Sequence, residues 1–171
     1  SDSARAAIYI GDGKSVVNLL DGEEWSQTIA MLTTARVPVK SFAIGPDTDN
    51  RLLAALANHT GGNLAIDQET TRAAEAGAFL ANSADGAGTW VQSAKVPEGV
   101  TELLPSQSPP LRSDRETILI GRGTIAGATA HVEADTASGP LTWDLPVTAA
   151  HEDHAYLETL VANASADGGM S

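Results

Sequence analysis

The stretch VPVKSFAIGPDTDNRLLAALANHTGGNL, residues 37–64, decides the fold of this chain. Its apolar start, residues 37–44, predicts a buried strand that ends at a loop of turn-forming residues. A helix then begins at the N-cap Asp49 and stops at Gly61 and Gly62. Its apolar stripe consists of Leu52, Leu53 and Leu56. Because a third short strand follows at residues 63–66, the stretch predicts a strand-helix-strand unit with parallel strands.

The same alternation extends to both sides of this stretch. Residues 6–10, AAIYI, predict a buried strand closed by Gly11-Asp12-Gly13, and an amphipathic helix is expected from about residue 22 to 35 with Asp21 as N-cap. An alanine-rich segment, residues 69–82, predicts a further helix. Short connections between alternating strands and helices imply right-handed crossovers, and therefore an open parallel α/β sheet with flanking helices.

The composition of the chain changes after Ser83. Residues 83–88, SADGAG, are typical of a linker, and five short runs separated by Pro- and Gly-rich turns then predict antiparallel β structure. These runs are residues 89–96, 100–104, 116–122, 128–134 and 140–147. A last helix is expected over about residues 153–164. The predicted fold is an α/β unit, residues 1–84, followed by a small antiparallel β module with a terminal helix, residues 85–171.

Charge and composition exclude several classes of protein. The chain of 171 residues has 10 Lys and Arg against 22 Asp and Glu, a formal net charge of −12, so nucleic-acid binding through phosphates is not expected. The absence of Cys excludes disulfides, thiolate zinc sites and a cysteine nucleophile. No apolar run approaches the roughly 20 residues that span a bilayer, so no membrane span is expected.

The segment IYIGDG, residues 8–13, holds the strongest candidate functional residue. A carboxylate beyond the end of a parallel strand can reach a metal or a reacting group, and Asp12 has that position. The alternative is that Asp12 only caps its turn. The segment also resembles the GDG turn of haloacid-dehalogenase-type phosphohydrolases, but the second acidic residue and the D-x-D nucleophile motif of that family are missing. No catalytic residue is assigned.

A second resemblance covers far more of the chain. Residues 8–62 resemble the second half of a von Willebrand factor A domain, in which a strand with an Asp-Gly turn precedes a helix, a V-x-V-x-x-F-x-I-G strand and an L-x-x-L-A-x-x-T-G-G helix end. The matching residues are Val37, Val39, Phe42, Ile44, Gly45, Leu53, Leu56, Ala57, Thr60, Gly61 and Gly62. Residues 100–123 resemble the β segment after this domain in proteins similar to inter-α-trypsin-inhibitor heavy chains, with Pro105, Pro110, Leu111 and residues 118–122 as the match.

The von Willebrand resemblance implies a metal-ion-dependent adhesion site for Mg²⁺ or another divalent cation. Only Asp12 carries over as a ligand, with Gly11 and Gly13 as its turn residues, so this chain alone is expected to bind metal weakly or not at all. The implied function is non-enzymatic recognition of a protein partner, or adhesion, and the resemblance suggests an extracytoplasmic location. The alternative is a structural or assembly segment in which Lys14 neutralises Asp12 in place of a metal.

Other motifs are weaker candidates. Gly121-Arg122-Gly123 with Gly127 has the wrong spacing for a dinucleotide site, and a β-turn is the preferred interpretation. His151 and His154 are placed in a solvated helix start. Asp49 is expected to be a cap rather than a calcium ligand beside Asp47. Arg112, Asp114, Arg115 and Glu116 are expected to form a surface ion-pair cluster.

Half of an α/β domain has a further physical consequence. A truncated parallel sheet leaves one strand edge and part of an apolar face uncovered. We therefore expect either that another chain supplies the missing half, or that this piece rearranges or associates.

Overall fold

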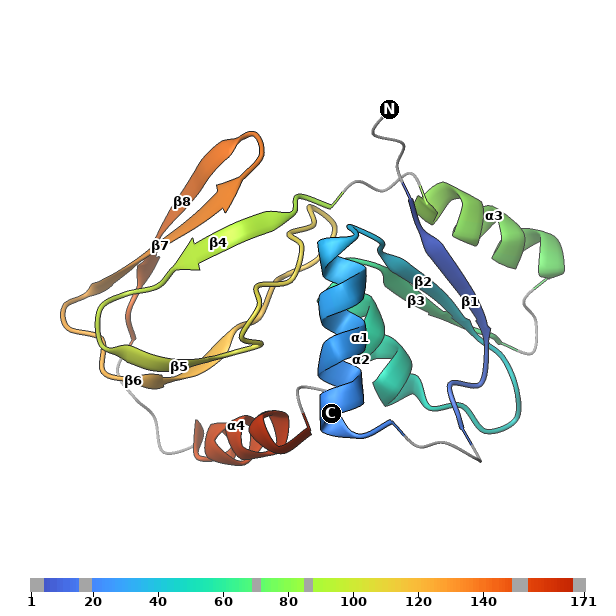
Figure 1. Cartoon of the computed structure of the whole chain (residues 1–171), viewed down its shortest axis with the longest axis horizontal. Helices are drawn as coiled ribbons and strands as arrows, with labels where there is room; N and C mark the ends of the chain where they lie inside the picture. The colour runs from blue at the N-terminus through green and yellow to red at the C-terminus, as the bar shows by residue number, and fades with distance from the viewer. Residues whose placement is uncertain (1–4, 16–19, 69–71, 85–87, 149–153, 168–171) are drawn as a thin grey trace. The chain divides into compact units, whose positions relative to one another are not determined.

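The computed structural model describes residues 5–15, 20–68, 72–84, 88–148 and 154–167 of the chain. It divides into two compact units between Gly88 and Thr89 (Figure 1). The first unit is α/β, and the second contains antiparallel strands and a C-terminal helix. This confirms the predicted fold class. No helix among the described residues is long and apolar enough to cross a membrane.

The first unit is built on a three-stranded parallel sheet in the order β1-β2-β3. Its elements are β1 (Ala7–Gly11), α1 (Gly22–Thr34), β2 (Val39–Ala43), α2 (Asn50–Thr60), β3 (Asn63–Ile66) and α3 (Ala73–Ala84). Helices α1 and α2 lie together on one side of the sheet, and α3 lies on the other (Figure 1). All five residues of β2 are buried, so the central strand and its helices form the core of the unit.

Helix α1 begins and packs as its sequence predicts. The carboxylate of Asp21 accepts hydrogen bonds from the N–H groups of Glu23 and Glu24, and the Glu24 carboxylate reaches back to the Asp21 N–H, which completes a capping box. One face of the helix is buried, with Trp25 only 1% exposed. The Trp25 ring meets the His59 ring of α2 edge to face, with centroids 5.7 Å apart.

The Thr-Gly-Gly sequence after α2 has a separate structural role at each position. The Thr60 hydroxyl donates to the Leu56 carbonyl at 2.7 Å and accepts the Val39 N–H at 3.0 Å, which fastens the end of α2 to the start of β2. Gly61 is the left-handed C-cap, with φ of 72°. At Gly62 an added Cβ would lie 1.6 Å from the Val39 carbonyl oxygen. The motif therefore brings two adjacent backbones into close contact.

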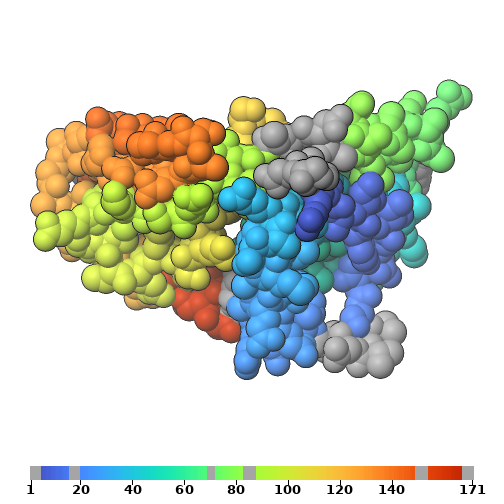
Figure 2. Space-filling model, turned by 45° about the horizontal axis from the view of Figure 1, so that its top comes forward, coloured from blue at the N-terminus to red at the C-terminus, as the bar shows by residue number. Residues whose placement is uncertain are grey.

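Strand β1 is much more exposed than its neighbour β2, so the prediction of a buried strand at residues 6–10 is wrong. Ile8 is 54% exposed, Tyr9 37% and Ile10 61%. In the space-filling view the blue atoms of this N-terminal strand are visible at the surface (Figure 2). Among the described strands only β2 pairs with β1, so one edge of β1 has no strand beside it. Within the described part of the chain, this edge and the apolar side chains of Ile8 and Ile10 are therefore uncovered.

The second unit contains two antiparallel sheets and a helix. Its elements are β4 (Val91–Lys95), β5 (Val100–Leu104), β6 (Ile120–Gly123), β7 (Thr129–Thr136), β8 (Gly139–Pro146) and α4 (Tyr156–Asp167). One sheet has the order β4-β7-β8, and the other pairs β5 with β6. Alternate residues of β7 are buried, among them Ala130 and Ala134. The opposite face of this sheet carries the cross-strand pairs Lys95–Glu133 and His131–Asp144.

Three elements have boundaries that differ from the predicted ones. Helix α3 begins at Ala73 rather than at residue 69 and continues to Ala84, which takes in the first residues assigned to the linker. Strand β6 begins at Ile120, because residues 116–119 are not paired with another strand. Helix α4 begins at Tyr156 and ends at Asp167, about one turn later than expected.

Candidate functional site

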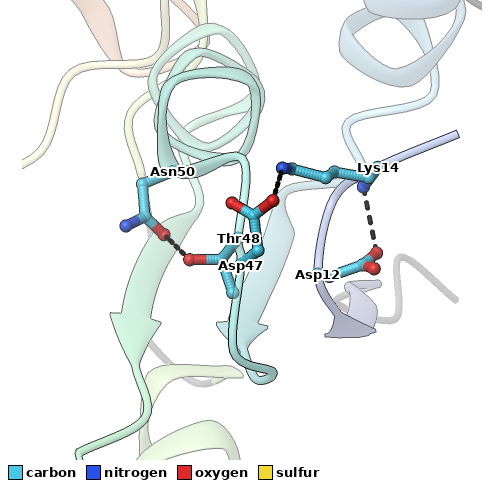
Figure 3. A network of polar contacts seen from close by, with 5 residues as sticks. All are labelled: Asp12, Lys14, Asp47, Thr48 and Asn50. Carbon is cyan, nitrogen blue, oxygen red and sulfur yellow. Dashed lines mark hydrogen bonds and ion pairs between the residues drawn. The ribbon is translucent and has the colours of Figure 1, made fainter.

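The candidate site lies where the loops after β1 and β2 meet, at the carboxyl end of the parallel sheet. Two backbone hydrogen bonds join these loops: the Ile44 N–H donates to the Gly11 carbonyl at 3.1 Å, and the Asp49 N–H donates to the Asp12 carbonyl at 2.7 Å. Asp12 is exposed and stands directly after β1. Figure 3 shows Asp12 and Lys14 of the first loop beside Asp47 and Thr48 of the second.

The Asp12 side chain makes a local hydrogen bond. Its Oδ1 accepts the backbone N–H of Lys14 at 3.0 Å, as in an Asx-turn. The turn-cap interpretation of Asp12 is therefore correct as far as local structure is concerned. This bond orients the carboxylate at the edge of the sheet, next to the second loop.

The Lys14 ammonium group pairs with a different carboxylate from the one expected. Its Nζ forms an ion pair with Asp47 in the loop after β2 (Figure 3). Lys14 contacts Asp12 through its backbone N–H. The idea that Lys14 neutralises Asp12 is corrected accordingly. Because the side chains of Lys14 and Asp47 are 40% and 79% exposed, water screens this pair and its contribution to stability is small.

The second loop leads directly into α2. The Asp49 carboxylate accepts the Leu52 N–H at 3.0 Å, so Asp49 is the predicted N-cap. The Thr48 hydroxyl donates to the side-chain oxygen of Asn50 at 3.0 Å. The polar groups of this loop thus fix the start of the helix and the position of Asp47.

Of the two glycines on either side of Asp12, Gly13 is favoured by its backbone conformation and its close packing, while Gly11 lies against a side chain that can move. Gly13 has φ of 75°, and an added Cβ would lie 2.9 Å from Cγ of Leu53 in α2. Its N–H donates to the Tyr9 hydroxyl at 3.0 Å. A Cβ on Gly11 would lie 2.7 Å from the same hydroxyl oxygen. The turn therefore packs against Tyr9 of β1 and against Leu53 of α2.

The described residues do not form a metal centre on their own. Among them there is no group of three or more His, Cys, Asp or Glu side chains that could hold a metal ion. One exposed carboxylate, Asp12, faces a loop whose own carboxylate, Asp47, is paired with Lys14. Asp12 is the one ligand that the family resemblance carries over to this edge, and a firmly held Mg²⁺ needs further oxygen ligands.

Gly121 and Gly123 serve β pairing rather than a β-turn, whereas Gly127 lies in a bend after β6 with φ of 96°. Gly121 and Gly123 lie in and at the end of β6. A Cβ on Gly121 would lie 2.4 Å from the Glu102 carbonyl oxygen, and one on Gly123 would lie 2.2 Å from the Gly99 carbonyl oxygen. The preferred β-turn interpretation is therefore wrong for these two residues, which allow β5 and β6 to approach closely.

Two further candidates have different outcomes. His151 lies outside the described residues, while the His154 ring meets the Tyr156 ring edge to face at the start of α4. One pair that the sequence analysis missed is His131 with Asp144, whose Nδ1 and Oδ1 atoms are 2.7 Å apart across β7 and β8. The sequence feature that could have predicted this pair is the tight turn between Thr136 and Gly139. Counting five residues outward from each of these two residues leads to His131 and Asp144, which therefore lie opposite each other.

The mixed-charge cluster contains a two-point ion pair. Nε and Nη2 of Arg112 donate to the two oxygens of Asp114 at 2.7 and 2.5 Å. This hydrogen bonding lowers the pKa of Asp114 from 3.8 to about 2. Burial, followed by repulsion from Arg112, lowers the pKa of Arg115. The Arg112 side chain is only 8% exposed, while the side chain of Asp114 is 60% exposed. The ion pair therefore joins a buried guanidinium group to a carboxylate at the surface.

We predict that the Arg112→Gln substitution raises the pKa of Asp114 from about 2 towards its ordinary value of 3.8. In the wild type the folded pKa lies below the unfolded one, so the stabilising effect of the pair is present above pH 3.8 and is lost as the pH falls towards 2. Carboxyl carbon NMR titration measures both values. An Asp114 midpoint that stays near 2 in the variant would show that another group causes the shift.

Comparison with known proteins gives a likeness to solved structures. No family model and no curated protein matches the chain. Among solved structures, the chain is similar to a von Willebrand factor type A protein from Catenulispora acidiphila, with 14% sequence identity and a TM-score of 0.46. The match covers 88% of this chain and 43% of that protein. This chain therefore spans less than half the length of that protein.

Proposed function

We propose that this chain is the second half of a von Willebrand factor A-type domain with the β segment that follows it, and that it serves in protein recognition or adhesion. The supporting observation is Asp12, exposed on a glycine-flanked turn at the carboxyl end of a parallel sheet. The order of β1, α1, β2, α2 and β3 and the Thr60-Gly61-Gly62 contact with β2 also agree with the resemblance. The recognition surface is the edge formed by the loops after β1 and β2.

In this proposal a divalent cation acts in the intact domain and not in this chain alone. Asp12 would supply one ligand, and the remaining oxygen ligands would come from a segment that completes the sheet. A bound Mg²⁺ with an open coordination position would take a carboxylate of the protein partner. The described residues by themselves do not make this site, which is why the metal test requires the full-length protein.

The test is a calorimetric titration of the full-length protein with Mg²⁺. We expect saturable binding that is lost in Asp12→Ala. The matched control is Asp47→Ala, which removes the same charge from the adjacent loop and leaves the proposed ligand in place. The control should keep wild-type affinity within a few-fold. Equal binding by wild type and Asp12→Ala would exclude a metal role for Asp12.

The second candidate is a structural or assembly role without metal. It is favoured by one observation: the hydrogen bond of Asp12 to Lys14 and the ion pair of Lys14 with Asp47 already connect the two loops. In this case the full-length protein would show no saturable Mg²⁺ binding, and Asp12→Ala would lower only the stability of the turn.

We also propose that the protein is not an enzyme. The sheet has a GDG turn, but Asp12 is followed by Lys14 and Ser15 where haloacid-dehalogenase-type phosphohydrolases usually have a second acid. We therefore expect no turnover of a generic phosphomonoester in the presence of Mg²⁺. Turnover abolished by Asp12→Asn would replace the recognition proposal with a phosphohydrolase.

A further inference from the structure

The side chain of Tyr9 reaches past the end of its own strand. Tyr9 is the middle residue of β1, and its hydroxyl accepts the N–H of Gly13 at 3.0 Å, beyond the end of the strand. A Cβ on Gly11, which lies between them in the sequence, would be 2.7 Å from the hydroxyl oxygen and 3.0 Å from the ring carbon that carries it. The absence of a side chain at Gly11 therefore leaves room for Tyr9 to reach the turn.

Backbone hydrogen bonds hold the other end of this turn. The Gly11 carbonyl accepts the Ile44 N–H at 3.1 Å, and the Asp12 carbonyl accepts the Asp49 N–H at 2.7 Å, so the end of β1 is joined to the loop after β2. Gly13 comes next, with φ of 75°, and glycine has more backbone conformations open to it than other residues. The Tyr9 hydroxyl therefore restrains a residue that would otherwise have wide conformational freedom.

The direction of the Asp12 carboxylate depends on this part of the turn. Its Oδ1 accepts the Lys14 N–H at 3.0 Å (Figure 3). Because the peptide group that carries this N–H directly follows Gly13, a change in the Gly13 backbone would move the donor away from the carboxylate. The Tyr9 hydroxyl is thus connected to the Asp12 carboxylate through Gly13 and Lys14.

We propose that Tyr9 is a positioning residue for Asp12: its hydroxyl keeps the turn in the conformation that presents the Asp12 carboxylate at the edge of the sheet. This inference rests on the proposed function, because it concerns the same carboxylate. A ligand binds only those molecules whose site has the competent conformation, so the apparent dissociation constant rises as their fraction falls. All the contacts used here lie within the described residues and do not involve the segment that completes the sheet.

The Tyr9→Phe substitution removes the hydroxyl and keeps the ring. In the 171-residue chain, solvent-exchange NMR should show the Gly13 amide hydrogen exchanging about two- to tenfold faster, the factor that corresponds to one hydrogen bond of ordinary net strength. The bond is exposed to water, so the midpoint of urea unfolding should not change. The matched control is Tyr156→Phe in α4, the only other tyrosine. An equal Gly13 exchange rate in wild type and Tyr9→Phe would overturn the proposal.

Gly11→Ala tests the same contact from the other side. The added Cβ would displace the Tyr9 hydroxyl, so we expect Gly13 exchange to accelerate as it does in Tyr9→Phe. Because both substitutions break the same hydrogen bond, the double variant should exchange no faster than the faster of the two single variants. Accelerations that multiply in the double variant would show that Gly11 and Tyr9 act independently, which contradicts the proposed arrangement.

Titration of the full-length protein with Mg²⁺ separates this inference from the proposed function. Tyr9→Phe should raise the dissociation constant about two- to tenfold, Tyr156→Phe should leave it unchanged, and Asp12→Ala should abolish binding. If Asp12→Ala binds Mg²⁺ as tightly as the wild type, the proposed function itself fails. If Asp12→Ala loses binding while Tyr9→Phe keeps wild-type affinity, only the positioning role of Tyr9 is wrong.

Discussion

Gly62→Ala is expected to destabilise the first unit by at least about 3 kcal/mol, or to prevent it from folding. An added Cβ would lie 1.6 Å from the Val39 carbonyl oxygen and 2.5 Å from the carbonyl carbon. Both atoms belong to the backbone of the buried strand β2, which cannot move without breaking its bonds to β1 and β3. Urea unfolding followed by circular dichroism measures the loss.

The matched control is Gly77→Ala in α3. Its added Cβ would meet nothing within 4 Å, and the residue lies inside a helix. Alanine has the higher helix propensity, so this variant should be more stable than the wild type by about 0.5–1 kcal/mol. If Gly62→Ala unfolds at the same urea concentration as the wild type, the close approach of α2 and β2 in this fold is wrong.

Trp25→Ala is expected to cost about 3–5 kcal/mol, the usual range for removing a large aromatic side chain from a core. Trp25 is 1% exposed, and its ring contacts His59 where α1 packs on α2. The cavity would lie between the two helices that cover one side of the sheet (Figure 1). The loss of stability is measured by urea unfolding. Circular dichroism is used to follow it, because the variant lacks the fluorescence of Trp25.

Met31→Ala on the same helix is the control for Trp25. Met31 is 65% exposed, so its truncation removes little buried area and should change the free energy of unfolding by less than about 0.5 kcal/mol. Equal effects of the two substitutions would mean that α1 does not pack on α2 through Trp25.

The sequence predicts the first unit well because its local signals agree with its long-range contacts. Asp21 and Asp49 cap the helices that their positions indicate, and Gly61 ends α2 as the left-handed residue. Here propensity, capping and hydrophobic pattern all favour the same fold.

The misplaced elements are those in which the local signal is weak. Helix α3 is rich in alanine, so its composition predicts a helix but does not identify where the helix begins. In the second unit, residues 116–119 lead into the apolar run of residues 118–120 that predicts a strand, but β6 begins only where a partner is available at Ile120. Pairing depends on distant residues, and a pattern within one strand contains no information about them.

The site could be predicted only in part for the same reason. The Asp-Gly turn is visible in the sequence, and so is the cap at Asp49. The ion pair of Lys14 with Asp47 joins two loops that are separated by a helix and a strand, and it depends on how β1 and β2 are aligned.

The central claim is that Asp12 contributes to a divalent-cation site in the intact domain. Paramagnetic relaxation by Mn²⁺ tests it at the residue itself, because the ion broadens the NMR signals of nearby amides. In the full-length protein, low concentrations of Mn²⁺ should broaden the amide signals of Gly11 and Gly13 first, and Asp12→Ala should remove this effect. Broadening that begins elsewhere, for example at the acidic first turn of α1, and is unchanged in Asp12→Ala would contradict the claim.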